Sequence, residues 1–336
     1  MAEKKTKTKR KTARAKKTRR YGTRYAADGD TLKGTLLGLA IVIAFVAVIA
    51  GIIWLCGGLG GEGESGSGGS VETPAAVSDV KVHFIDVGNA DCALIECADG
   101  AILIDAVEYD DFQKIAAYLN GRGIERLNYV IATHAHGDHM GAMDDVILKY
   151  KVDELIIPTK AVDEKFYNDV ISAARSRGVP YRIAAPGETP AFPTGTLEVL
   201  DDGSDTSVDE SKSEELNNNS YVLKFTYGKT SFLFTGDAER KYELEMLDKG
   251  EDLDADVLKV SHHGSNDATC SDFIKAVTPK YAVIPVGRDN SYGHPSKKTV
   301  SRLQNAGAKV YRTDELGDVV VTTDGKKISI TYDGAN

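Results

Sequence analysis

The sequence predicts an α/β protein in which two mixed β-sheets carry helices on their outer faces, preceded by one transmembrane helix. From residue 79 onward, short apolar runs alternate with stretches of helical periodicity, an order typical of layered α/β folds. Residues 36–55 contain no charge over twenty positions, which is the length that crosses a bilayer core. Residues 133–142 bring three His and one Asp together directly after an apolar run.

The first 33 residues form a strongly basic tail. Of the 41 Lys and Arg residues 13 lie in this segment, and of the 50 Asp and Glu residues only 3 do, so it carries +10 and the remainder −19. It has too few apolar residues to form a core. Nucleic-acid binding is one interpretation; the favoured one is a positive flank that orients a membrane span from the cytoplasmic side.

Residues 34–56 are predicted to be the transmembrane helix. Around Trp54 and Cys56 the sequence fits neither a signal-peptide cleavage site nor a lipoprotein acceptor site, so we expect an uncleaved anchor. The N-terminus would then be cytoplasmic, and the rest of a single-pass cell-membrane protein would be extracellular. Residues 57–75 are a flexible linker, with eight glycines among the first thirteen positions. The folded domain is expected over 76–336.

The elements of this domain follow in two halves. In the first, strands are predicted over 81–87, 92–97, 101–105, 129–133, 154–158 and 181–185, and helices over 110–121, 143–150 and 163–177. Residues 201–219 are polar and acidic and are expected to be a surface loop. In the second half, strands are predicted over 221–227, 230–235, 256–260, 281–286, 309–313, 318–323 and 327–332, and helices over 239–249 and 296–306. The tight turn Gly228-Lys229 indicates a hairpin.

The segment 133–142 has the composition of a metal site. It contains His134, His136, Asp138 and His139 within six positions. His and Asp resist full burial unless they are paired or bound to metal. Neutral imidazole and carboxylate are suitable ligands for zinc, manganese or iron. Because a tight loop after a strand can direct alternate side chains toward one point, the segment predicts a metal site.

The loop and five further marks resemble the metallo-β-lactamase superfamily, whose H-x-H-x-D-H motif stands here as His134-x-His136-x-Asp138-His139. Within that superfamily the chain resembles the extracellular hydrolase domain of the ComEC competence proteins and their free-standing relatives. The other marks are FIDVGNAD at 84–91, NNNS at 217–220, FTGD at 234–237, KVSHHGS at 259–265 and YGHP at 292–295. The resemblance covers about 79–332. It implies the αββα sandwich of this family, with metals at one edge of the two sheets.

The resemblance implies two divalent metal ions, zinc or manganese. His134 and His136 would bind the first ion, Asp138 and His139 the second, and Asp237 would bridge both. In the wider superfamily a third His usually serves the first ion, but none occurs between the loop and Asp237. ComEC-like members carry an Asn-rich mark there.

Several other residues receive roles from the resemblance. The amide of Asn219 is the expected substitute for the missing His, and because it is a poorer ligand the first ion should bind more weakly. His263 is the favoured last ligand of the second ion, and His262 would face the substrate or a metal. His294 follows a strand and can project toward the metals, where it would donate to a developing phosphoryl charge or protonate a leaving oxygen. With Asp138, His262 and His294 form the expected catalytic set.

Three carboxylates are expected to support the ligands. Asp105 would steady a ligand His from behind. Asp86 and Asp91 flank a turn that contains a glycine, and supporting the site or shaping the turn are equal alternatives for them.

These features predict a metallo-hydrolase, most simply an extracytoplasmic phosphodiesterase or nuclease of ComEC type. Two metals would generate a bridging hydroxide at neutral pH and stabilise both the attacking and the departing oxygen. The resemblance suggests DNA as the substrate, but the net charge of −19 repels a polyanion. An esterase of cell-wall teichoic acid or phosphorylcholine is therefore the alternative enzyme. The alternative of another class is a metal-containing binding or sensing module with little turnover. The sequence indicates no protein partner.

Overall fold

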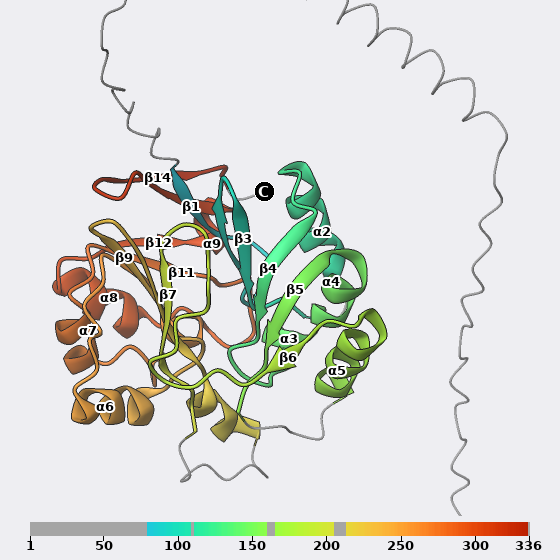
Figure 1. Ribbon diagram of the computed structural model, residues 1–336. Coiled ribbons are helices and arrows are strands. Elements are labelled where there is room, and N and C mark those ends of the chain that lie inside the picture. The colour runs from blue at the N-terminus through green and yellow to red at the C-terminus, as the bar shows by residue number, and fades with distance from the viewer. Residues whose placement is uncertain (1–78, 109–110, 160–164, 205–212, 335–336) are drawn as a thin grey trace, which may run out of the picture. The chain divides into compact units, whose positions relative to one another are not determined.

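The computed structural model of the protein describes residues 79–108, 111–159, 165–204 and 213–334. In this part of the chain two sheets lie face to face between two groups of helices (Figure 1), so the predicted αββα arrangement is confirmed. The predicted tail 1–33, membrane helix 34–56 and linker 57–75 lie outside the described residues. Among the residues that are described, no helix is both long and apolar enough to cross a bilayer.

The first sheet has the strand order β14-β13-β1-β2-β3-β4-β5-β6. Its strands are β1 (Val80–Phe84), β2 (Ala93–Cys97), β3 (Gly100–Ile104), β4 (Arg126–Ile131), β5 (Lys151–Ile156), β6 (Tyr181–Arg182), β13 (Val319–Thr323) and β14 (Ile328–Tyr332). The second sheet has the order β12-β11-β10-β9-β8-β7. Its strands are β7 (Thr196–Asp201), β8 (Val222–Tyr227), β9 (Thr230–Phe234), β10 (Val257–Lys259), β11 (Tyr281–Ile284) and β12 (Lys309–Arg312).

The alternation of side chains along each strand separates the core into layers. In β3, Ala101 and Leu103 face the outer helices, whereas Ile102 and Ile104 face the other sheet. Phe84 of β1 and Phe234 of β9 meet in the layer between the sheets, with ring centroids 6.1 Å apart. Both faces of the central strands are thus buried, as the continuous apolar runs of the sequence require.

Helices cover the outer face of each sheet (Figure 1). Those on the first sheet are α2 (Phe112–Gly121), α3 (Gly137–Met140), α4 (Met143–Lys149) and α5 (Lys165–Arg177). Those on the second are α6 (Arg240–Lys249), α7 (Ser271–Val277) and α8 (Lys297–Asn305), and a short α9 (Thr313–Leu316) follows β12. Helix α6 ends at Gly250, whose φ of 75° is the left-handed conformation that glycine adopts at little cost.

Several elements differ from the prediction. Strand β7, helix α7 and the one-turn helices α3 and α9 stand where no such element was expected, and the expected surface loop 201–219 ends in a 3-10 helix, η1 (Ser213–Asn219). In β7 only Leu197 and Val199 alternate over a short stretch, and α7 has just two turns, so each gives a weak local signal.

The parallel strands bring distant loops to one rim. Strands β3, β4 and β5 run parallel in the first sheet, and β9, β10 and β11 run parallel in the second. Loops that follow parallel strands emerge at the same edge of a sheet. The His loop after β4 and the loops after β9, β10 and β11 therefore meet there, although Ile131, the end of β4, is 153 positions from Ile284, the end of β11.

Candidate metal centre

Four side chains from three loops converge at the rim. Asp138 and His139 belong to α3, Asp237 follows β9, and His263 lies in a 3-10 turn, η2 (Ser261–Gly264), after β10. His139 Nε2 lies 3.4 Å from Asp237 Oδ2, and His263 Nε2 lies 3.3 Å from Asp138 Oδ2 and 3.7 Å from Asp237 Oδ2. One ligand atom of each residue falls within 4.8 Å of all the others. We call these four residues the four-ligand pocket.

Hydrogen bonds to the far ring nitrogens fix the two imidazoles of this pocket. His139 Nδ1 is 2.8 Å from Asp105 Oδ2, and His263 Nδ1 is 3.0 Å from the carbonyl oxygen of Pro285. Asp105 is fixed in turn, because it accepts hydrogen bonds of 2.8 Å from both the amide and the hydroxyl of Thr133. An Nδ1–H donated in this way leaves Nε2 as the metal-facing lone pair. Asp105 thus has the contacts of the steadying carboxylate expected from the sequence.

The turn that carries the second His pair separates its two rings. His262 and His263 have φ angles of 50° and 49°, a left-handed conformation that non-glycine residues rarely adopt. Two such residues in succession direct neighbouring side chains differently. His263 is buried as part of the four-ligand pocket, whereas His262 stays a quarter exposed.

Neighbouring carboxylates determine the pKa values of the two imidazoles in the four-ligand pocket. Burial by itself would lower the pKa of His139, but the carboxylates of Asp237, Asp105 and Asp138 outweigh it and hold that pKa well above its ordinary value. Burial opposes the same effect at His263, whose pKa Asp237 and Asp91 raise to about 10. The site is therefore an anionic cluster that attracts positive charge, either as protons on its imidazoles or as a cation.

The four-ligand pocket fits a divalent metal ion. Two imidazole nitrogens and two carboxylate oxygens form a donor set suited to zinc or manganese. His139 Nε2 is buried and has no hydrogen-bond partner among the described residues. A buried polar atom of this kind requires an explanation, and a metal ligand supplies one. The fold and the donor set together imply divalent ions, without identifying the metal.

His134 and His136, which we call the histidine pair, lie beside this pocket in a different environment. His134 Nε2 is 2.9 Å from His136 Nδ1, so the two rings contact each other. The other nitrogen of His134 lies 3.2 Å from the Thr133 hydroxyl and 3.3 Å from the Ser220 hydroxyl. Burial, with the neighbouring imidazoles His139 and His136, lowers the pKa of His134 well below its ordinary value.

Asn219, the expected substitute for the missing His, is buried at the end of η1. Its amide nitrogen donates to the carbonyl of Gly203, and its Oδ1 has no hydrogen-bond partner among the described residues. The ligand role of this amide oxygen stays a prediction. The neighbouring Ser220 connects the two parts of the site, because its hydroxyl accepts a 3.0 Å hydrogen bond from the amide of Asp237.

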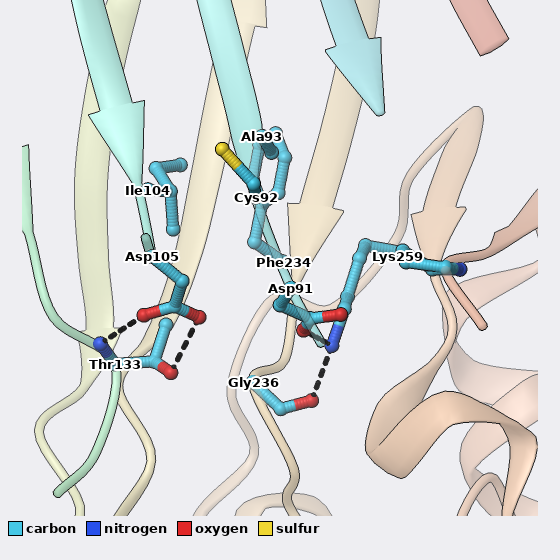
Figure 2. A pocket seen from close by; sticks show the side chains of 10 residues that line it. Asp91, Cys92, Ala93, Ile104, Asp105, Thr133, Phe234, Gly236 and Lys259 are labelled. Carbon is cyan, nitrogen blue, oxygen red and sulfur yellow. Dashed lines mark hydrogen bonds and ion pairs between the residues drawn. The ribbon is translucent and has the colours of Figure 1, made fainter. Parts of the chain in front are cut away.

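A buried ion pair supports the four-ligand pocket from below. The Lys259 ammonium pairs with Asp91 and donates a 2.8 Å hydrogen bond to the carbonyl of Gly236, as Figure 2 shows. It also lies 3.6 Å from Asp237 Oδ1. Both partners line a small cavity beneath the rim. Asp91 also lies 3.4 Å from His263 Nδ1, so it contacts a ligand of the pocket.

The sequence interpretation counts Lys259 among the charges that could steer a phosphate, but the structure buries it in an ion pair within the site. A lysine at the end of the apolar run 257–260 is a signal of burial, since it occupies the side of β10 that faces the other sheet. Its partner Asp91 is 168 positions away, so only the fold reveals the pairing. Asp86, by contrast, shapes its own turn: its carboxylate accepts a hydrogen bond from the Gly88 amide, and its amide donates to Asp318.

The remaining two predicted residues stand above the pocket. His262 Nε2 is 3.9 Å from Asp237 Oδ2, and its Nδ1 is 3.5 Å from Glu239 Oε1 and 3.4 Å from Asn217 Nδ2. The His294 ring meets the His262 ring edge to face, with centroids 5.5 Å apart. Burial and then the neighbouring His262 lower the pKa of His294, which favours a neutral ring at pH 7 with one N–H group able to donate.

The site and the fold together define a metallo-hydrolase. A profile of the metallo-β-lactamase superfamily matches residues 85–288, and the chain belongs to this superfamily. It is related to ComEC-type competence proteins. It is 31% identical over 264 residues to ComE operon protein 3 of Bacillus subtilis (strain 168) and 29% identical over 255 residues to Competence protein ComA of Neisseria gonorrhoeae.

Each of these alignments covers 73% of this chain and 33% of the relative, so the chain spans about a third of their length. Among solved structures it is similar to the metallo-β-lactamase fold protein YhfI from Bacillus subtilis, with 11% identity and a TM-score of 0.49. That likeness covers 73% of this chain and all of YhfI.

Proposed function

We propose that this protein is a metal-dependent phosphodiesterase of ComEC type, anchored in the cell membrane by residues 34–56 with its catalytic domain outside. The observation that carries the proposal is the four-ligand pocket with two further imidazoles, His262 and His294, beside it. Metal ligands alone would also be compatible with a site that only binds an ion. Additional imidazoles next to them supply the hydrogen-bond and proton-transfer groups that hydrolysis needs.

Different side chains of the site would have different roles in hydrolysis. Asp138, His139, Asp237 and His263 would hold one ion, and the histidine pair, with the Asn219 amide, would hold the other more weakly. Bound zinc or manganese would polarise a phosphoryl oxygen and lower the pKa of water. His262, held by Glu239 and Asn217, faces the substrate, and His294 donates a hydrogen bond to an oxygen that gains charge.

DNA is the substrate that the relationship to competence proteins favours. The net charge of −19 beyond residue 33 opposes it. Exposed Arg288, Lys297 and Lys298 near the YGHP loop offer local positive charge to a phosphate backbone. Because of the overall charge we retain a second candidate, an esterase of cell-wall teichoic acid or phosphorylcholine. The linker 57–75 would allow the catalytic domain of such an esterase to reach its substrate in the cell wall.

A substrate comparison tests the proposal. The full chain, loaded with Mn²⁺ or Zn²⁺, is incubated with single- and double-stranded DNA and with a phosphorylcholine ester, and an Asp237→Ala variant serves as the control. We expect cleavage of DNA that the variant lacks. If only the phosphorylcholine ester were cleaved, the nuclease function would be wrong and the cell-wall esterase would be supported. A metal-loaded protein that cleaves neither would instead be a binding or sensing module.

A further inference from the structure

Tyr292 is an unusual surface residue. It is 72% exposed, the largest exposure among the exposed large hydrophobic side chains in the described part of the chain; the others are Leu148, Ile183 and Tyr332. It lies on the loop after β11 that also carries His294. A ring this exposed buries little of its surface within its own fold, and its position next to a candidate active site leaves that surface open to a bound substrate.

A series of rings connects Tyr292 to the metal centre. The Tyr292 ring lies nearly parallel to the His294 ring, at an interplanar angle of 17° and a centroid distance of 5.9 Å. The His294 ring meets the His262 ring edge to face at 5.5 Å, and His262 Nε2 is 3.9 Å from Asp237 Oδ2. The outer face of Tyr292 is thus the solvent-facing end of a ring series that begins at the pocket.

The loop that presents this ring is held in place. Asn290 closes it, donating hydrogen bonds of 2.9 Å to the carbonyl of Gly287 and 2.6 Å to that of His294, and accepting one of 3.0 Å from the His294 amide. Beyond His294 the loop is bound to η2, because the Ser296 amide donates to the Gly264 carbonyl at 2.8 Å. A rigidly presented aromatic ring binds a partner at low entropic cost.

We propose that Tyr292, stacked on His294, is a platform for the nucleobase next to the scissile phosphodiester, and that it selects unpaired nucleotides. The proposal rests on the proposed phosphodiesterase function. A base has an apolar face that stacks on an aromatic ring, whereas a glycerol or ribitol unit of a wall polymer has none. In a duplex the neighbouring base pairs cover that face, so single strands and frayed ends suit the platform. Exposed Arg288 and Lys297 would contact the flanking phosphates.

The test compares two single-stranded oligonucleotides of equal length and charge, one with ordinary bases and one with abasic residues on both sides of the cleavage position. Removal of a stacking aromatic ring weakens binding by about fivefold or more per base. For the Mn²⁺-loaded full chain we therefore expect a KM at least about fivefold lower for the base-bearing strand. In Tyr292→Ala the ratio of the two KM values should fall to about one. Tyr292→Phe should retain the ratio.

Tyr332→Ala is the matched control, because Tyr332 is also an exposed tyrosine, 53% exposed, but lies on β14. It should retain the wild-type ratio. A wild-type protein that cleaves both strands with equal KM would overturn the platform and leave the phosphodiesterase function intact. A Tyr292→Ala variant that keeps the ratio would do the same. Cleavage of neither strand, with double-stranded DNA also left intact, would overturn the DNA phosphodiesterase function and the platform together.

Discussion

The two parts of the candidate metal centre differ in how firmly their ligand side chains are held. In the four-ligand pocket each imidazole has its outer nitrogen held, His139 by Asp105 and His263 by the Pro285 carbonyl, and two carboxylates face the inner nitrogens. In the histidine pair, His134 and His136 contact each other, and hydroxyl groups flank the outer nitrogen of His134. Preorganised ligands with compensating charge bind an ion without rearrangement, whereas the two imidazoles of the histidine pair need a further ligand.

The pKa shifts follow the same division. Carboxylates raise the pKa of His139 and His263 against the effect of burial, whereas burial lowers the pKa of His134. The four-ligand pocket is thus an anionic site that attracts a cation, whereas burial favours a neutral ring at His134. The comparison teaches that the H-x-H-x-D-H motif is not a single unit: its two halves enter different environments.

The largest effect should come from removing a pocket ligand. Asp237→Asn keeps the shape of the side chain but removes its charge, so we expect tight binding of Zn²⁺ to weaken at least about 1,000-fold. His134→Ala should leave one tightly bound ion per chain, within about tenfold of the wild-type affinity. Equilibrium dialysis with metal analysis measures both. Equal losses in the two variants would break the distinction between the two parts.

A second prediction concerns the ion pair beneath the four-ligand pocket. Lys259→Met would leave the buried Asp91 carboxylate without its partner, which typically costs about 3 kcal/mol of unfolding free energy. Urea denaturation of the metal-free protein measures this. The double variant Lys259→Met/Asp91→Asn should recover most of the loss, since it removes both charges.

Lys280→Met is the matched control, because the Lys280 pair with Asp256 lies at the surface and its loss should change stability little. If Lys259→Met were as harmless as Lys280→Met, the buried pair would not support the pocket.

A third prediction concerns the pH dependence of metal binding, which should differ between the four-ligand pocket and the histidine pair. Carboxylates raise the pKa of both pocket imidazoles, to about 10 for His263, which favours their protonated forms at pH 7 in the metal-free protein. Metal binding must release those protons, so the apparent affinity should rise with pH, about tenfold per pH unit for each proton released. Calorimetry in buffers of different ionisation enthalpy counts the protons. A second ion at the histidine pair should release none from His134 above pH 6.5, where the lowered pKa keeps that ring neutral.

The sequence alone predicts the part of this site whose residues are nearly contiguous. It predicts little of the part whose residues are far apart along the chain. The four motif residues of the loop are nearly contiguous, so their clustering needs no tertiary information. Asp237 and His263 each follow an apolar run, and the parallel strands β9 and β10 bring them to the rim on which β4 ends. The family resemblance supplied that step, because no local pattern tells which strands are parallel neighbours.

Other features depend on contacts that sequence patterns do not encode. Lys259 reads as a charge available to a phosphate, but Asp91 from the β1–β2 connection makes it an internal partner. Likewise Ser220 and Asn219 belong to one motif, yet Ser220 contacts His134 and Asp237, whereas the Asn219 amide nitrogen turns to Gly203. Two neighbouring residues diverge in this way because the 3-10 helix ends at Asn219, so Ser220 no longer follows the helical arrangement of side chains.

The smallest effect should come from the contact that joins the two parts. The Ser220 hydroxyl accepts a hydrogen bond from the Asp237 amide and lies 3.3 Å from His134 Nδ1. Ser220→Ala leaves that buried amide without its acceptor, which costs about 1 kcal/mol of unfolding free energy. Because the amide only positions the Asp237 carboxylate, Zn²⁺ affinity of the four-ligand pocket should fall by less than about tenfold. A loss as large as that of Asp237→Asn would mean that the two parts act as one site, since a single hydroxyl between them would then control both.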